Sequence, residues 1–136
     1  MNTICFKLKR IALLTCDTRD RPLTTKEREK LAEKRAHGRP YYIPTDDNLK
    51  FTFKMYAYAF ECGYRLDCIG KEWADFLEVV DKRNALTHPK TSADLKVSPE
   101  QHNKAAIAFR WFHRVFQELT RACRATIKKW PSDLLT

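Results

Sequence analysis

The sequence is poor in glycine and shows little of the alternation between apolar and polar residues that predicts β-strands. Glycine accounts for 3 of its 136 residues, and apolar residues recur instead at the three- and four-residue intervals of amphipathic helices. Apolar residues make up 43% of the chain and charged residues 32%, a balance typical of globular proteins. A chain of this length suits one domain. We therefore expect an all-α protein.

Zinc-binding patterns are absent as well. The cysteines are odd in number, no two of them form a Cys-X-X-Cys pair, and no histidine lies close enough to complete a zinc-ligand set. The five are Cys5, Cys16, Cys62, Cys68 and Cys123. We expect them to be reduced thiols, mostly in the core, as in a cytosolic protein. No metal and no other cofactor is predicted.

The chain also lacks a long apolar run. Lys7, Lys9 and Arg10 precede the apolar stretch 11–14, an arrangement that resembles the start of a secretion signal. That stretch is too short for the hydrophobic region of such a signal, and no other segment is long enough to cross a membrane. These absences predict a soluble, cytoplasmic protein with no membrane partner.

Positive charge is abundant and unevenly distributed. The formal net charge is +9. Residues 1–40 hold 11 Lys or Arg against 5 Asp or Glu, residues 41–97 hold 8 against 9, and residues 98–136 hold 7 against 3. A basic surface attracts polyanions and speeds their capture, so RNA or DNA is the leading class of partner. An acidic protein is the alternative partner, because net charge alone does not distinguish binding of nucleic acid from binding of an acidic protein.

The first part of the chain is predicted to hold a basic helix and a charged arm. Residues 2–15 carry an apolar face at helical spacing, although the stretch is short enough for a strand; this face is Ile4, Leu8, Ile11 and Thr15. Eight of the fourteen residues in 24–37 are charged. That stretch is either an exposed helix, capped by Thr24 or Thr25, or an arm. A linker is predicted over 38–44.

Two further helices are predicted over 46–61 and 71–87. The apolar stripe of the first is Leu49, Phe53, Tyr56 and Phe60, and that of the second is Trp73, Phe76, Leu77 and Val80. Such stripes bury one face of a helix against its neighbours. Residues 62–70 contain two glycines and are predicted to connect the two helices.

The last helix has the clearest start signal. Ser98 is predicted to cap it, with Pro99 in the first helical position and Gln101 completing a capping box. Its apolar seam is Ala105, Phe109, Phe112, Phe116, Leu119, Cys123, Thr126 and Trp130. The stripes together predict an antiparallel bundle of four to five helices. We expect a single domain over 1–136, with the basic helix and arm over 1–45 and the helical core over 46–130.

The third predicted helix ends in polar residues. Its apolar stripe, continued by one turn, reaches Arg83 and Asn84, which are costly to bury without partners and therefore indicate a pocket or an interface. Pro89 disfavours helical geometry in the residue before it, so the helix is predicted to end just before His88. In a continuous helix Arg83 and His88 would point about 140° apart. The break lets His88 turn back toward Arg83.

These residue types suit phosphodiester chemistry. Histidine gives or takes a proton near neutral pH, and the negative end of a helix favours its protonated form. Arginine supplies a permanent charge whose geometry fits phosphate. RNA carries its own nucleophile, the 2′-hydroxyl, so His88 and Arg83 could cleave it without a metal. On spacing alone, a structural pair at a helix end stays the alternative.

The stretch Arg83-Asn84-Ala85-Leu86-Thr87-His88-Pro89, at the end of an amphipathic helix, resembles the signature of the HEPN superfamily (higher eukaryotes and prokaryotes nucleotide-binding). That signature is Arg, four to six residues and then His, often with a polar residue directly after the Arg. A long helix follows, as predicted here from Ser98 to Trp130. The resemblance covers about residues 46–130 in architecture and only this short stretch in detail.

The resemblance implies a helical bundle that forms a homodimer, with two copies of the motif meeting in one composite active site. It implies a metal-independent endoribonuclease of the toxin, antiphage-effector or RNA-processing kind, which leaves a 2′,3′-cyclic phosphate and a 5′-hydroxyl. An antitoxin or another regulatory protein is then an expected partner. In this reading His88 is the general acid or base, Arg83 binds phosphate, and Asn84 orients the site.

A basic stripe on the last helix is a second candidate. It lies roughly opposite the apolar seam and is read either as a track for the RNA backbone or as an ordinary solvated face; its members are Arg110, Arg114, Arg121, Arg124 and Lys128. Two other functions stay open. One is a non-catalytic HEPN-type module that binds RNA or protein, and the other is a purely structural partner in a complex.

Overall fold

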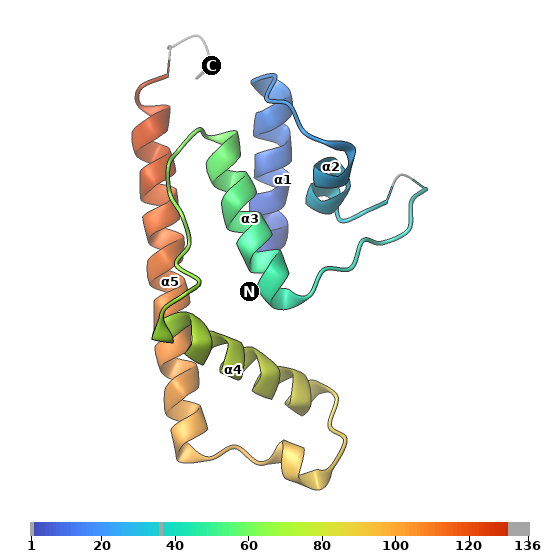
Figure 1. Ribbon diagram of the computed structural model, residues 1–136, viewed down its shortest axis with the longest axis vertical. Helices are drawn as coiled ribbons and strands as arrows, with labels where there is room; N and C mark the ends of the chain where they lie inside the picture. Colours follow the sequence, from blue (N-terminus) through green and yellow to red (C-terminus); the bar gives the residue numbers. More distant parts are fainter. Residues whose placement is uncertain (1, 36, 131–136) are drawn as a thin grey trace. The chain divides into compact units, whose positions relative to one another are not determined.

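The computed structural model describes residues 2–35 and 37–130 (Figure 1). Their regular structure consists of α-helices, one short 3-10 helix and an isolated bridge between Lys34 and Pro40, with no strand in these residues. The elements are α1 (Asn2–Thr18), α2 (Thr25–Ala32), α3 (Thr45–Ala59), α4 (Lys71–Thr87), η1 (Ser92–Leu95) and α5 (Pro99–Ile127). The predicted all-α class is confirmed, and the five α-helices in the described residues fall within the predicted four to five.

The chain forms two compact units. Among the described residues, unit 1 comprises those up to Leu66 together with Glu118–Trp130, and unit 2 comprises Asp67–Gln117. Unit 1 therefore holds α1, α2, α3 and the C-terminal part of α5, while unit 2 holds α4, η1 and the N-terminal part of α5. In this division α3 groups with the two preceding helices, whereas the predicted core over 46–130 grouped it with α4.

In unit 1, α1 packs along α3 and the two helices run in the same direction (Figure 1). Lys9 in the first half of α1 bonds to Asn48 near the start of α3, and Arg19, just past α1, bonds to the carbonyl of Ala59 at the end of α3. The end of α1 and the start of α3 lie at opposite ends of the pair, so a parallel arrangement needs a long connection between them. Residues 19–44, which include α2, provide it.

The buried face of α1 differs from the predicted one. Ile11 is 44% exposed, whereas Ala12 and Cys16 are 0% exposed. Small side chains let the backbones of two helices approach closely, so packing against α3 selects the face with Cys5, Leu8, Ala12 and Cys16 over the one with larger Ile11.

Of the two alternatives for residues 24–37, the structure contains a short helix. Thr24 caps α2 through a reciprocal capping box with Glu27, and Leu31 packs into the core of unit 1 with 1% exposure. The helix ends at Ala32 because Glu33 takes a left-handed conformation, with φ of 56°, and its carboxylate binds Lys9. Ala36, within the predicted helix, lies outside the described residues.

In unit 2, the first half of α4 contacts the N-terminal part of α5, and the two helices diverge toward the end of α4 (Figure 1). Glu72 near the start of α4 pairs with Arg114, and Glu78 six residues later pairs with Lys104. Between these ion pairs lies an aromatic cluster of Trp73, Phe76 and Trp111, whose ring centroids are 5.3–5.9 Å apart. The predicted bounds of α4 are confirmed, and so is the burial of Trp73, Phe76 and Val80.

The predicted seam of α5 is partly wrong. Phe112, Leu119 and Cys123 are buried as predicted, but Phe109 is 72% exposed. The buried positions in the unit 2 part of the helix are Ala108, Trp111, Phe112 and Val115. Trp111 sets this face, because its indole fills the space against Trp73 and Phe76. No described helix is both long and apolar enough to cross a membrane.

Candidate functional site

The predicted helix break is present at the end of α4. The helix ends at Thr87, and His88 leaves helical geometry with φ of −129° and ψ of 67°. Its backbone N–H still donates to the carbonyl of Asn84 at 2.9 Å, so His88 closes the last turn as its C-cap. Pro89 accounts for the break, because a proline disfavours helical φ and ψ in the residue before it.

The segment after His88 is fastened to the same unit. The carboxylate of Asp94 accepts hydrogen bonds from the backbone N–H groups of Lys90 and Thr91, at 2.9 and 3.1 Å. These bonds lower the pKa of the Asp94 carboxyl below its ordinary value. Lys82 on α4 donates to the carbonyl of Asp94 at 3.0 Å. His88 and Pro89 therefore lie between two attachments to α4. The first is the C-cap bond of His88, and the second is the bond from Lys82 to Asp94.

Arg83, Asn84 and His88 are all exposed. The extrapolation that continued the buried stripe of α4 through Arg83 and Asn84 is therefore wrong: full burial on this helix ends at Val80, and the side chains of the last turn are exposed or half-buried. Within the described residues no hydrogen bond or ion pair engages the side chains of Arg83, Asn84 or His88, and none joins Arg83 to His88. The three side chains are accessible to a ligand from solution.

A groove with a volume of about 520 Å³ lies in unit 2 between α4 and the N-terminal end of α5. Arg83 lines it, whereas Asn84 and His88 do not. Its apolar wall is Val79, Leu86, Val97 and Ala105, and its polar lining includes Ser98, Gln101 and His102. Of the two residues taken to indicate a pocket or an interface, the structure thus brings Arg83 to a groove and leaves Asn84 outside its lining.

The three cationic side chains that line this groove differ in whether another residue engages them. Lys104 pairs with Glu78 at 2.7 Å, an ion pair that raises the pKa of the lysine, and Lys82 is bonded to the carbonyl of Asp94. Arg83 is the lining cation that no described residue engages. The first backbone N–H groups of α5 lie at the same end of the unit, and the start of a helix carries partial positive charge. The lining also contains two carboxylates, Glu78, which pairs with Lys104, and Glu100.

The capping box of α5 forms as predicted. The backbone N–H of Gln101 donates to the Ser98 hydroxyl at 3.1 Å, and that of Ser98 donates to the Gln101 side chain at 3.0 Å. It fixes the point where the groove meets the start of the helix. No cluster of three or more His, Cys, Asp or Glu side chains suitable for a metal occurs in residues 2–35 and 37–130.

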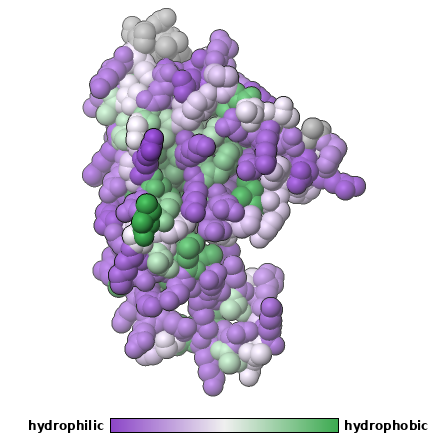
Figure 2. Space-filling model, in the orientation of Figure 1, coloured by the Kyte–Doolittle hydropathy of each residue, from purple (hydrophilic) through white to green (hydrophobic). Residues whose placement is uncertain are grey.

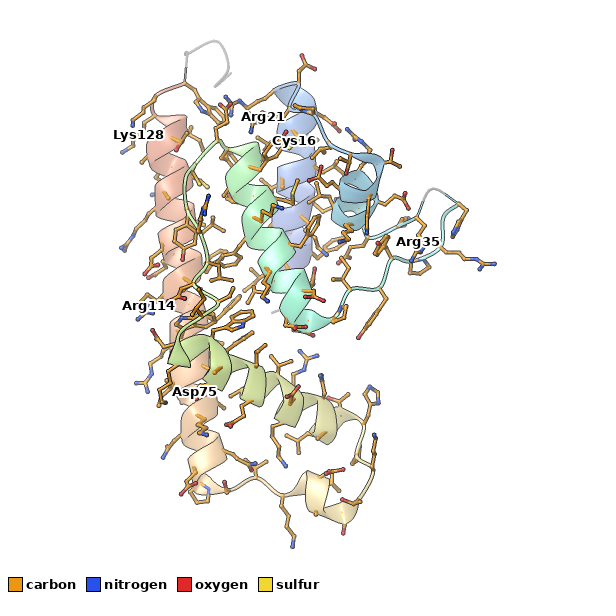
Figure 3. The ribbon with its side chains drawn as sticks, in the orientation of Figure 1. Cys16, Arg21, Arg35, Asp75, Arg114 and Lys128 are labelled. Carbon is orange, nitrogen blue, oxygen red and sulfur yellow. The ribbon has the colours of Figure 1, made fainter. Side chains whose placement is uncertain are left out.

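The basic stripe of α5 is exposed along its length. Arg110 and Arg114 belong to unit 2, where Arg114 pairs with Glu72 at 2.8 Å, and Arg121, Arg124 and Lys128 belong to unit 1 (Figure 3). Hydrophilic side chains cover much of the face shown in Figure 2. Exposure is compatible with both readings of the stripe, as an RNA track and as a solvated face.

Sequence reasoning missed a second hollow, in unit 1. It has a volume of about 400 Å³ and is lined by Lys30, Tyr41, Tyr42, Ile43, Pro44, Asp47, Lys50, Phe51 and Lys54. Tyr42 is 84% exposed, and the Lys30 ammonium lies over the Phe51 ring at 5.2 Å. The one available signal was the four-residue spacing of Lys50 and Lys54, which places both on one face of α3.

Comparison of the chain with known protein families, with curated proteins and with solved structures finds no match.

Proposed function

We propose that the protein is a metal-independent endoribonuclease of the HEPN type, with its reaction centre at the C-terminal end of α4. One observation carries this proposal: Arg83, Asn84 and His88, the residues of the motif, are together at a helix end, exposed, and unengaged by any described side chain. A structural helix-end pair would instead bond its two members to each other or to neighbouring groups.

In the proposed reaction, one imidazole removes the proton from the ribose 2′-hydroxyl. The 2′-oxygen attacks the adjacent phosphorus and the bond to the 5′-oxygen breaks, which leaves a 2′,3′-cyclic phosphate. The leaving 5′-oxygen takes a proton from a second imidazole. The guanidinium of Arg83 stabilises the extra negative charge on the phosphorus oxygens, and Asn84 orients the phosphate. His88 of a second copy of the chain supplies the second imidazole in a homodimer.

The groove beside Arg83 gives the RNA a place next to the scissile phosphate. Its apolar wall, including Leu86 and Val97, suits the face of a base, and Arg83 in its lining is the cation for the phosphate. The exposed stripe of α5 offers further contacts to the RNA backbone. By the same resemblance, the biological setting we propose is that of a toxin or antiphage effector restrained by a partner protein.

The test is incubation of purified protein with RNA in the presence of a chelator, followed by analysis of the product ends. We expect 2′,3′-cyclic phosphates, and a loss of about 100- to 10,000-fold in the cleavage rate for His88→Ala, the usual contribution of a proton-transfer residue. The matched control is His113→Ala, since His113 is also exposed but binds Gln117 on α5. Unchanged cleavage by His88→Ala would refute the assignment.

The second candidate is a nucleic-acid-binding module without catalysis, favoured by the lysine- and tyrosine-lined hollow of unit 1. Binding that weakens with salt, resists Arg83→Ala and is accompanied by no cleavage would support this candidate over the first.

A further inference from the structure

Two cysteine sulfurs lie close together in unit 1. The Sγ atoms of Cys62, just after α3, and Cys123, in the C-terminal part of α5, are 3.0 Å apart, although the residues are 61 positions apart in the sequence. The two thiols are free. A disulfide has a sulfur–sulfur bond of about 2.05 Å, so the two atoms need to move about one ångström to form one.

The backbone around Cys62 holds this pair together. The Cys62 N–H donates to the carbonyl of Ala57 at 2.9 Å, which fixes the turn out of α3. On one side of Cys62, Phe60 stacks on Trp130 with centroids 5.8 Å apart, and on the other the Tyr64 hydroxyl donates to Glu118 at 3.1 Å. Contacts on both sides of Cys62 therefore hold this segment against the C-terminal part of unit 1. These contacts keep the backbone of Cys62 close to Cys123, so the short distance between the sulfurs does not come from side-chain rotamers alone.

The two thiols differ in their environment. Cys62 is half-buried, whereas Cys123 is 1% exposed. Burial and the contact with Cys62 raise the pKa of the Cys123 thiol far above its ordinary value. A thiol reacts with an oxidant as its thiolate and only where the oxidant reaches it. Cys62 is therefore the thiol that meets an oxidant first, and Cys123 is positioned to react second.

We propose that Cys62 and Cys123 form a site of reversible oxidation, at which a hydroperoxide converts the two thiols to a disulfide. The Cys62 thiolate attacks one peroxide oxygen, the O–O bond breaks, and Cys62 becomes a sulfenic acid while water or an alcohol leaves. The Cys123 sulfur then attacks the Cys62 sulfur, the S–O bond breaks and water leaves. The sulfurs lose two electrons, which reduce the peroxide, and a dithiol returns them when it reduces the disulfide.

The position of the bond gives it a large effect on the fold. The chain between Cys62 and Cys123 contains the whole of unit 2, Asp67–Gln117. A crosslink that closes so long a loop restricts the unfolded chain strongly. We expect oxidation to raise the unfolding temperature of the protein by about 10 °C. This inference does not depend on the proposed ribonuclease activity.

The experiment treats the reduced, folded protein with hydrogen peroxide. Intact mass spectrometry is expected to show the loss of two hydrogens, peptide mapping is expected to identify the Cys62–Cys123 pair, and dithiothreitol is expected to reverse both. Cys62→Ser and Cys123→Ala abolish the crosslink. Cys68→Ser is the matched control, because Cys68 is half-buried like Cys62. This variant is expected to retain the crosslink between Cys62 and Cys123.

Peptide mapping of the wild-type protein decides the question even if the buried Cys123 does not tolerate substitution. A crosslink found between Cys62 and Cys123 in the folded protein, with the rise in unfolding temperature, supports the proposal. It is overturned if the folded protein keeps both thiols after treatment, if Cys62 stops at sulfinic acid, or if another pair forms the crosslink.

Discussion

Both units contain ion pairs, but they differ in how far their cations are buried and engaged. In unit 1 Lys9 is buried against Glu33 and Asn48, and Arg19 and Arg21 share Glu61 at 2.6 and 2.7 Å. The Arg19 guanidinium also lies 3.7 Å from the Trp130 ring centroid. In unit 2 the last turn of α4 leaves Arg83, Asn84 and His88 unengaged by any described residue. The N-terminal excess of positive charge is thus partly used to hold the fold together.

Net charge along the chain therefore does not by itself locate a binding surface. Residues 1–40 are the most basic part of the sequence, yet several of their cations have carboxylate or aromatic partners. The near-neutral middle of the chain holds the accessible cation of the proposed site.

The largest effect is expected in the aromatic cluster of unit 2. Trp111→Ala removes a side chain that is 4% exposed and contacts Trp73 and Phe76. We expect it to lower the free energy of unfolding by about 4 kcal/mol, the usual cost of deleting a buried aromatic ring. Urea unfolding measures this. Phe109→Ala is the control, since Phe109 is 72% exposed, and an equal loss there would mean that the assigned face of α5 is wrong.

A slightly smaller effect is expected at the buried cation of unit 1. Lys9 is 1% exposed, and Lys9→Ala leaves the Glu33 carboxylate and the buried Asn48 side chain without this donor. The expected loss is about 3 kcal/mol, at the low end for a broken buried pair because Glu33 remains partly hydrated. Lys7→Ala, two residues away and exposed, is expected to change stability by less than about 0.5 kcal/mol. Equal losses at both positions would contradict the buried network.

The two helix caps should behave alike in the two units. Thr24→Ala in unit 1 and Ser98→Ala in unit 2 each remove a hydroxyl that accepts a backbone N–H bond at 3.1 Å. Each is expected to cost about 1 kcal/mol in thermal or urea unfolding. If only one of the two substitutions lowers the stability, units 1 and 2 do not unfold together.

The smallest effect is expected in the response to acid. The hydrogen bond from Arg19, with the charges of Arg19 and Arg21, holds the pKa of the Glu61 carboxyl below its ordinary value in the folded protein. The ion pairs therefore add stability above the ordinary pKa of glutamate, about 4.3, and this contribution is lost as the pH falls through the lower pKa of the folded state.

Glu61→Gln is then expected to reduce the fall in unfolding temperature between neutral pH and the acid range. Asp81→Asn is the control, because Asp81 is exposed on α4 and bonds to no described residue. An unchanged pH dependence in Glu61→Gln would show that these exposed ion pairs contribute nothing measurable.

Much of this fold follows from local signals. Pro89 sets the end of α4, and the Ser98 capping box sets the start of α5; both act through neighbouring residues and were predictable. The end of α2 was not, because Glu33 stops the helix where its side chain meets Lys9, 24 positions away. The rotated face of α5 likewise depends on Trp73 and Phe76, which lie on another helix.

The candidate site also combines features that neighbouring residues determine with features that depend on distant parts of the chain. The break at His88 was predictable from sequence, but the exposure of Arg83 depends on where packing along α4 stops. The position of Arg83 on the helix indicated a pocket or an interface, but the residues of α5 that complete the groove could not be predicted from helical spacing. The Cys62–Cys123 contact joins residues far apart in the chain, so helical spacing carries no signal for it.

The central claim is that the exposed end of α4 cleaves RNA through the ribose 2′-hydroxyl. The most direct measurement maps the cleaved bond in a short RNA and then replaces the single 2′-hydroxyl beside that bond with hydrogen. The account predicts that the wild-type protein, in chelator, stops cutting at that bond while it still binds the strand. Continued cleavage at the deoxy position, or products with 5′-phosphate ends, would contradict it.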